Sequence, residues 1–160
     1  MPYIKQSRKN LLTMLNSVKV SADKTQYSIL ITDRISDNSE VANTLADHIS
    51  GCNVLVITDS NVKTLYASRI STVLENAGVA ESHLASFPAG EQRKSLATVS
   101  ELYDKALKAD LDRDSVIIAL GGGVVGDVAG FVAATYMRGI SFVQIPTTLL
   151  AMVDSSVGGK

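Results

Sequence analysis

The stretch that decides the fold is Val116-Ile117-Ile118-Ala119-Leu120-Gly121-Gly122-Gly123-Val124-Val125-Gly126-Asp127. Its first five residues are uncharged and mostly β-branched, which is typical of a strand buried on both faces. The glycines follow at once. After them comes a set of residues at helical spacing, namely Val128, Phe131, Val132 and Thr135. The stretch therefore predicts a strand, a glycine turn and a helix, in that order.

The glycines of this turn favour an anion site. Gly121, Gly123 and Gly126 match the G-x-G-x-x-G pattern, which is a weak signal unless it lies between a strand and a helix. Glycine permits positive φ angles and lets a ligand approach the backbone closely. The free N–H groups at the start of the helix then face an anion, with help from the helix dipole. A tight turn without a ligand needs fewer than three successive glycines, so we expect a phosphate or pyrophosphate here.

The acidic residue of the turn has two possible roles. Dinucleotide sites of this kind usually carry an acid about 20 residues further on, but residues 139–148 contain none. Asp127 lies inside the turn instead, where a carboxylate would repel a phosphate. It is therefore expected either to accept hydrogen bonds from a ribose or nicotinamide group or to cap the helix N-terminus.

Composition excludes several classes of function. Hydrophobic residues make up 46% of the 160 residues and aromatic residues 5%, which favours an aliphatic α/β core. A net charge of −1 gives no support for binding to nucleic acid or to an acidic membrane. The single cysteine, Cys52, cannot form an internal disulfide and fits a reducing compartment, and two histidines with one cysteine cannot complete a closed zinc site. We expect a cytoplasmic protein, because no signal peptide and no long apolar run is found.

Strands and helices alternate along the rest of the chain. Strands over 17–21 and 27–32, around a polar turn at 23–25, predict a hairpin. Further strands over 53–58, 83–87 and 140–145 alternate with helices over 38–49, 62–74 and 96–107. This order predicts an α/β fold: a Rossmann-like parallel sheet flanked by helices, with an N-terminal β-hairpin. Ile4, Leu11, Leu12 and Leu15 suit either a short amphipathic helix or a frayed extension.

Polar residues follow two of these strands at their carboxyl ends, where open parallel sheets bind ligands. Asp59 and Asn61 come after the strand over 53–58. Asp59 can bind ribose hydroxyls, or it can cap the next helix, a role that Ser60 can also fill. Glu91 and Lys94 come after the strand over 83–87, and they either hold a nucleotide or form a solvated ion pair.

The last residues have the composition of a substrate loop. Thr147 and Thr148 offer hydroxyl groups at the start of a short helix after Pro146. Residues 154–160 combine a carboxylate, two serines, two glycines and a lysine. Since a natural domain seldom ends inside such a loop, we expect the chain to be part of a longer protein.

Four motifs of the chain closely resemble those of the 3-dehydroquinate synthase family. They are Pro88-x-Gly90-Glu91-Gln92-x-Lys94-Ser95, Gly121-Gly-Gly-Val-Val-Gly-Asp127-x-Ala-Gly-Phe131, Tyr136-x-Arg138-Gly139 and Pro146-Thr-Thr-Leu-Leu-x-x-Val-Asp-Ser-Ser-Val-Gly-Gly-Lys160. The similarity runs from about Tyr27 to the last residue and is most specific in the final motif. Residues 1–25 match only loosely.

The resemblance implies a two-domain enzyme. In this family an N-terminal α/β domain binds NAD, and a helical C-terminal domain supplies the ligands of zinc or cobalt. The active site lies between them and converts 3-deoxy-D-arabino-heptulosonate 7-phosphate to 3-dehydroquinate and phosphate, on the shikimate route to aromatic amino acids. NAD takes a hydride, phosphate is eliminated and the hydride is returned, before ring opening and an aldol closure. By this resemblance residues 1–25 are an extension with the first hairpin strand, and residues 26–160 are the NAD-binding domain.

The resemblance also implies roles for individual residues. Asp59 and Asn61 match adenosine contacts, and Glu91 and Lys94 match ribose contacts. Gly122, Gly123 and Asp127 match the pyrophosphate and nicotinamide side, and Thr147, Thr148 and Leu150 match further NAD contacts. Asp154 and Lys160 match positions that meet both NAD and substrate. Arg138 matches a residue that reaches the substrate phosphate, in some members from the neighbouring subunit of a dimer; without the resemblance it would be an exposed turn residue.

Truncation is the main departure from the family. With no metal ligands and no helical domain in this chain, we expect the chain alone to be inactive and the full-length protein to be a homodimer. Two other interpretations stay open. One is the NAD-binding domain of a related sugar-phosphate cyclase or of a metal-dependent polyol dehydrogenase, and the other is a nucleotide-binding module without chemistry.

Overall fold

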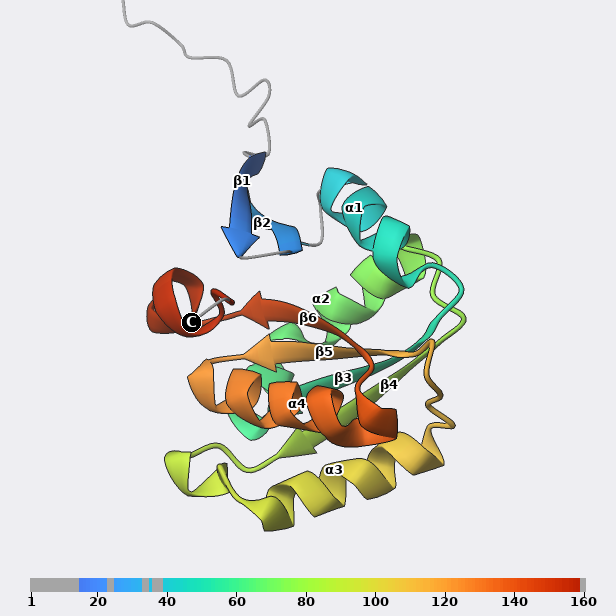
Figure 1. Ribbon diagram of the computed structural model, residues 1–160, viewed down its shortest axis with the longest axis vertical. Helices are drawn as coiled ribbons and strands as arrows, with labels where there is room; N and C mark the ends of the chain where they lie inside the picture. The colour runs from blue at the N-terminus through green and yellow to red at the C-terminus, as the bar shows by residue number, and fades with distance from the viewer. Residues whose placement is uncertain (1–14, 23–24, 33–34, 36–38, 159–160) are drawn as a thin grey trace, which may run out of the picture.

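The structure is a computed structural model that describes residues 15–22, 25–32, 35 and 39–158. Its main sheet has four parallel strands in the order β4-β3-β5-β6. These strands are β3 (Asn53–Asp59), β4 (Glu81–Phe87), β5 (Val116–Gly121) and β6 (Ser141–Pro146). A separate antiparallel hairpin joins β1 (Leu15–Ala22) to β2 (Thr25–Thr32). The prediction of a helix-flanked parallel sheet with an N-terminal hairpin is confirmed (Figure 1).

Helices cover both faces of the main sheet. They are α1 (Ser39–Ile49), α2 (Ser60–Asn76), α3 (Leu96–Lys108) and α4 (Gly123–Thr135). The expected end of α2 is confirmed, because Gly78 follows the cap residue Ala77 with a φ of +72°. A short 3-10 helix spans Glu91–Arg93, a second spans Tyr136–Arg138, and a π-helix spans Ala151–Ser155.

The two faces of β3 and β5 carry two separate cores. Leu55, Ile57, Ile117 and Ala119 point to the side of α3 and α4. The alternate residues of the same strands point to the side of α1 and α2, where they pack with Ile49, Ile70, Val73 and Leu74: they are Val54, Val56, Val116, Ile118 and Leu120. Because β5 is buried on both faces, its sequence is an uninterrupted apolar run and does not alternate between apolar and polar residues.

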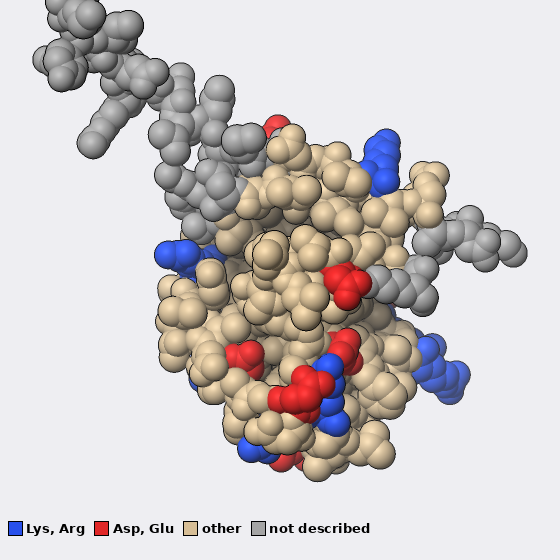
Figure 2. All heavy atoms as spheres, turned by 90° about the vertical axis from the view of Figure 1, so that its left-hand side faces the viewer, with Lys and Arg blue, Asp and Glu red and all other residues tan. Residues whose placement is uncertain are grey.

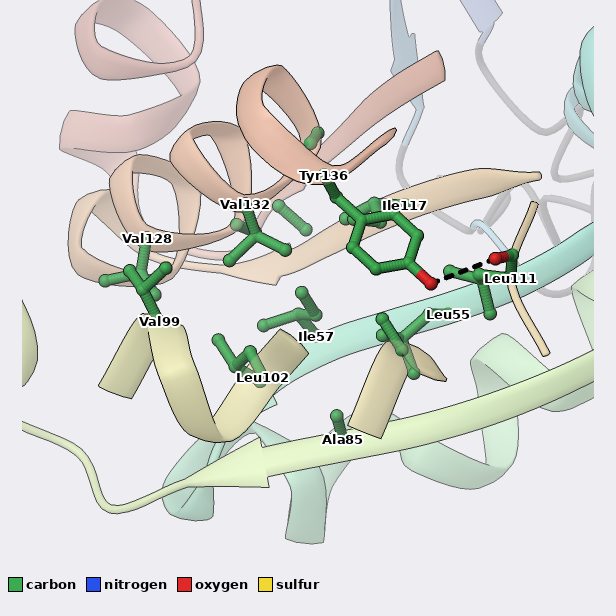
Figure 3. Close-up of a cluster of buried hydrophobic side chains, with 14 of the residues drawn as sticks. Leu55, Ile57, Ala85, Val99, Leu102, Leu111, Ile117, Val128, Val132 and Tyr136 are labelled. Carbon is green, nitrogen blue, oxygen red and sulfur yellow. Dashed lines mark hydrogen bonds between the residues drawn. The ribbon is translucent and has the colours of Figure 1, made fainter. Parts of the chain in front are cut away.

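One buried phenol closes the core beneath α3 and α4. Tyr136 lies among aliphatic side chains and donates its hydroxyl hydrogen to the carbonyl oxygen of Leu111 over 2.9 Å (Figure 3). Burial first, and then the charges of Asp110 and Asp112, raise the pKa of this phenol above 10.0. The hydroxyl therefore stays a donor in the folded protein at neutral pH.

The strand order places a switch point between β3 and β5. From β3 the chain crosses to β4 through α2, on one face of the sheet. From β5 it crosses to β6 through α4, on the opposite face. The carboxyl ends of β3 and β5, with α2 and α4 following them on opposite faces, therefore mark the place where sheets of this type bind ligands. Asp59 ends one strand and Gly121 ends the other.

The amino-terminal part differs in one respect from its prediction. Leu15 begins β1 rather than ending an amphipathic helix. The other residues of that pattern, residues 23–24 of the predicted turn and residue 38 of the first predicted helix lie outside the described residues, and Thr25 belongs to β2 rather than to the turn. Among the described residues, no helix combines the length and the apolarity that a membrane span requires.

Candidate functional site

Asp59 caps α2 and so belongs to the switch point in a structural role. Its Oδ1 accepts hydrogen bonds from the backbone N–H groups of Asn61, over 2.8 Å, and Val62, over 2.9 Å. The capping alternative is confirmed, and Ser60 does a different job: its hydroxyl oxygen accepts a hydrogen bond from the N–H of Ala89 over 3.2 Å. That bond joins the loop after β3 to the loop after β4. Asn61 is exposed on the first turn of α2.

Lys94 lies between two carboxylates at the same edge of the sheet. Its Nζ donates to Glu91 Oε1 over 2.9 Å and to Asp127 Oδ2 over 2.8 Å. The i, i+3 pair expected for Glu91 and Lys94 is confirmed, and the fold adds Asp127 from α4. Figure 2 looks onto this edge and shows acidic and basic side chains gathered in its lower half. The hydrogen bonds from Lys94 to Asp127 and then to Glu91 raise the pKa of the ammonium above 10.5, so it is charged at neutral pH.

The position of Asp127 excludes one of its two predicted roles. Gly122 is the N-cap of α4 and Asp127 lies one turn into the helix, so the alternative that Asp127 caps the helix is wrong. The carboxylate lies beyond the free N–H groups at the start of the helix and pairs with Lys94 instead. It remains available to a polar group of a ligand, because its side chain is 55% exposed.

The glycine turn differs from the other helix starts of the sheet. The side chains of Asp59 and Ser95 cap α2 and α3, whereas no side chain caps α4. The first helical bond of α4 runs from Gly126 N to Gly122 O over 3.0 Å, which leaves the earlier N–H groups without an intrahelical partner. These donors and the helix dipole suit an anion.

The reason for glycine in this turn is space rather than backbone conformation. Glycine permits positive φ angles, but this turn does not use them: among the described residues the glycines of positive φ are Gly51, Gly78, Gly90 and Gly139. A Cβ atom on Gly122 would lie 3.1 Å from Thr148 Cγ2, and one on Gly123 would lie 3.2 Å from Ser155 Oγ. The turn therefore needs glycine because the last segment of the chain lies against it.

That last segment starts from β6 and carries several predicted residues. The N–H of Thr147 donates to the carbonyl oxygen of Gly121 over 2.9 Å, which ties it to the glycine turn. Its hydroxyl oxygen is buried and has no hydrogen-bond partner among the described residues. Thr148 Oγ1 accepts from the N–H of Ala151 over 3.2 Å and so starts the short helix, as expected. Leu150 is 68% exposed.

Asp154 lies in a π-helix that ends this segment. The helix is marked by a bond from Ser156 N to Ala151 O over 3.0 Å, and Asp154 O accepts from Val157 N over 3.0 Å. Irregular turns of this kind occur often at functional sites. Lys160 lies outside the described residues.

Arg138 does not join the other candidates. It follows α4, whose 13 residues run from the glycine turn to the opposite edge of the sheet. At about 1.5 Å per residue the helix spans roughly 20 Å. Arg138 is exposed with a φ of 70°, directly before Gly139. The turn position is confirmed, and its side chain is remote from the Lys94 cluster of the same chain.

Two residues of the site were not predicted. Gln144 is the one amide in the half-buried strand β6, and its Nε2 donates to Ser156 O over 3.2 Å. Its polarity between the apolar residues Val143 and Ile145 was the available signal. The side chain of Ser155 lies close to Gly123 of the glycine turn. Its direction depends on the π-helix, and no periodicity in the sequence predicts a π-helix.

The arrangement suits a nucleotide rather than a metal. Uncapped N–H groups, the Lys94 ammonium and the free carboxylate oxygens offer partners for phosphates and for sugar hydroxyls. In the described part of the chain, no group of three or more His, Cys, Asp or Glu is placed to hold a metal ion.

The chain matches known proteins over most of its length. The family model described as 3-dehydroquinate synthase N-terminal matches residues 84–160. The 3-dehydroquinate synthase of Desulforamulus reducens is 51% identical over 146 residues, which are 91% of this chain and 40% of that protein. That of Symbiobacterium thermophilum is 57% identical over 106 residues, which are 66% of this chain and 29% of that protein. The chain thus spans about 40% or less of the length of these relatives.

Solved structures of two other synthases superpose on most of the chain. A 2-deoxy-scyllo-inosose synthase in complex with carbaglucose-6-phosphate, NAD+ and Co2+ superposes with a TM-score of 0.77 at 26% identity, over 88% of this chain and 37% of that one. A 2-epi-5-epi-valiolone synthase from Streptomyces hygroscopicus with NAD+ and Zn2+ bound gives a TM-score of 0.64 at 35% identity, over 71% of this chain and 31% of that one.

Proposed function

Because the chain belongs to the 3-dehydroquinate synthase family, we propose that it is the NAD-binding domain of an enzyme that converts 3-deoxy-D-arabino-heptulosonate 7-phosphate to 3-dehydroquinate and phosphate. One observation carries the NAD site: the uncapped start of α4 lies at the switch point of the sheet. Its N–H groups at Gly122 and Gly123 would hold the pyrophosphate. The unpartnered hydroxyl of Thr147, beside the same turn, also fits a polar ligand there.

The charged cluster would hold the sugar part of the cofactor. An ammonium has three N–H donors, and Lys94 directs two hydrogen bonds to Glu91 and Asp127. A third donor is left for a ribose hydroxyl. Asp59 uses Oδ1 for capping, so its other oxygen can accept from the adenosine ribose, next to Asn61.

When bound, NAD would supply hydride transfer with no net redox change. The residues of this chain orient the reactants. Thr148 and Leu150 start the segment that covers the glycine turn, and Asp154 and Lys160 follow in it, where they would meet both cofactor and substrate. A carboxylate and an ammonium in one segment can hold the hydroxyl and phosphate groups of a sugar acid.

Arg138 would bind the phosphate group of a substrate molecule that is held in the active site of the neighbouring subunit. It is exposed and lies a helix length from the Lys94 cluster of its own chain. A guanidinium binds phosphate oxygens in pairs, so an exposed arginine suits this role. The full-length protein would therefore be a homodimer. We further propose that it is located in the cytoplasm.

The metal would be held elsewhere. Zinc or cobalt appears in the related structures, whereas the described residues offer no group that fits one. We place the metal ligands in a C-terminal domain beyond this chain. The chain alone would then be inactive, because one wall of the cleft is missing and water is not excluded.

Sequence identity favours this proposal over the alternative of a related sugar-phosphate cyclase. The synthase of Desulforamulus reducens shares 51% of residues, against 26% and 35% for the two related cyclases. A polyol dehydrogenase would produce NADH in net amounts from a simple alcohol, and we expect none.

Titration of NAD into the purified chain by calorimetry tests the proposal. We expect saturable binding to one site, weakened by Asp127→Ala and by Lys94→Ala. Lys108→Ala is the matched control, since Lys108 lies in the last turn of α3, away from the cluster. The proposal fails if NAD neither binds the chain nor raises the melting temperature of the longer protein.

A further inference from the structure

Two side chains far from each other in the sequence hold the segment that follows the short helix. Gln144 Nε2, on β6, donates to Ser156 O over 3.2 Å. The hydroxyl of Tyr27, on β2, donates to Gly158 O over 3.2 Å. The two acceptors are backbone carbonyls only two residues apart. The segment from Ala151 to Gly158 follows β6 in the chain, and two of its last backbone carbonyls, those of Ser156 and Gly158, accept these hydrogen bonds.

The third glycine of the turn makes room for the first of these contacts. A Cβ atom on Gly126 would lie 2.9 Å from Gln144 Oε1, which is closer than ordinary packing allows. One turn later, a Cβ on Gly130 would lie 3.5 Å from the ring of Phe142, the residue two before Gln144 on β6. The close approach of α4 to β6 therefore seats the amide of Gln144 between the helix and the last segment.

The segment is held on its other side by the glycine turn. Ser155 Oγ would contact a Cβ on Gly123, and Thr148 Cγ2 would contact one on Gly122. The segment thus lies close to the turn and has two side-chain hydrogen bonds, one from β6 and one from the hairpin. The hairpin contact gives the first sheet of the chain a role at the site, although it pairs with no strand of the main sheet in the described structure.

We propose that Gln144 and Tyr27 are positioning residues that keep residues 154–158 beside the glycine turn and so set the affinity for the cofactor. Neither side chain needs to contact the ligand. Each holds a backbone carbonyl of the segment that carries Asp154. This inference rests on the proposed function for the identity of the ligand, but the holding of the segment itself does not.

Hydrogen exchange measured by mass spectrometry, together with NAD titration, tests this inference. In Gln144→Met, which keeps the length of the side chain but removes the donor, amides of residues 149–158 should exchange about fivefold faster, the effect of losing one hydrogen bond. The dissociation constant for NAD should rise by about the same factor. Tyr27→Phe should act in the same direction. The melting temperature should fall by no more than the roughly 2–4 °C that corresponds to about 1 kcal/mol in a chain of this length, and the amides of β3 and β5 should be affected less than those of residues 149–158.

Matched controls are Gln26→Met, on the exposed surface of β2, and Tyr66→Phe, on α2. Both should leave exchange and affinity unchanged. Unchanged exchange of residues 149–158 in Gln144→Met would overturn the inference. So would exchange that is faster throughout the sheet by the same factor as in residues 149–158, together with a fall in melting temperature well beyond roughly 2–4 °C, since that would indicate a general loss of stability. If the unmodified protein binds no NAD while the segment still responds to Gln144→Met, the proposed function fails and the positioning of the segment stands.

Discussion

Replacement of Thr58 by valine should destabilise the sheet at its switch point. Thr58 is 0% exposed, and its hydroxyl donates to the carbonyl oxygen of Leu120 over 2.7 Å, across the pair of strands β3 and β5. Valine keeps the volume and removes the donor, so the carbonyl of Leu120 is left buried without this partner. A buried polar group left without its partner costs about 1–3 kcal/mol.

The size of this loss is measurable by thermal unfolding. For a chain of this length each kcal/mol lowers the melting temperature by roughly 2–4 °C, so we expect a decrease of about 2–12 °C. The change should also weaken NAD binding, because Thr58 and Leu120 directly precede Asp59 and Gly121.

Thr58→Ser is the matched variant. It keeps the donor and loses one methyl group, a loss that costs about 0.5–1.5 kcal/mol when a comparable group is removed from a core. If the hydrogen bond is the larger contribution, the serine variant is the more stable of the two. A valine variant as stable as the unmodified chain in denaturant titrations would refute the reasoning.

Three further perturbations follow from the packing. Tyr136→Phe should cost about 1–3 kcal/mol at neutral pH, because Leu111 O loses its donor. Since burial raises the pKa of Tyr136 in the folded state, the unmodified chain should lose stability as the pH rises above about 10; an equal alkaline loss in the phenylalanine variant, followed by denaturant titration, would contradict this. Gly126→Ala should change the melting temperature little, because a gain of up to about 1 kcal/mol in helix propensity offsets the clash, but should displace Gln144 and speed exchange of residues 149–158; unaltered exchange would argue against that contact. Leu102→Ala, at a side chain 1% exposed, should cost about 2–5 kcal/mol in the same titrations, and a loss below about 1 kcal/mol would show that the core relaxes around the cavity.

The elements of this fold were predictable because each has a short-range pattern. The apolar run 116–120 has no polar alternation, which is what burial on both faces requires, and it forms β5. The helices repeat their apolar residues at 3.6-residue spacing, and Gly78 marks the end of α2 by its positive φ. Asp59 could be placed at the edge of the sheet from its position after β3, but not assigned to capping, because a cap depends on the direction of one side chain.

The glycine turn shows why the site was only partly predictable. The expectation of an anion site follows from glycines between a strand and a helix. The crowding of these glycines was not predictable, because the residues that crowd them, Thr148 and Ser155, come from a later segment.

By itself the sequence determined the order and type of the elements, the buried strands and the two candidate loops, since all of these depend on neighbours in the chain. The switch point depends on the order of the strands in the sheet, which only the tertiary structure decided. The tertiary structure alone decided that Lys94 pairs with Asp127, that Gln144 and Tyr27 reach the last segment, and that Arg138 lies at the opposite edge. These contacts depend on how α4 is seated against β6 and on where the hairpin packs. Such placements are set by side-chain volumes summed over the whole core, and no local pattern records them.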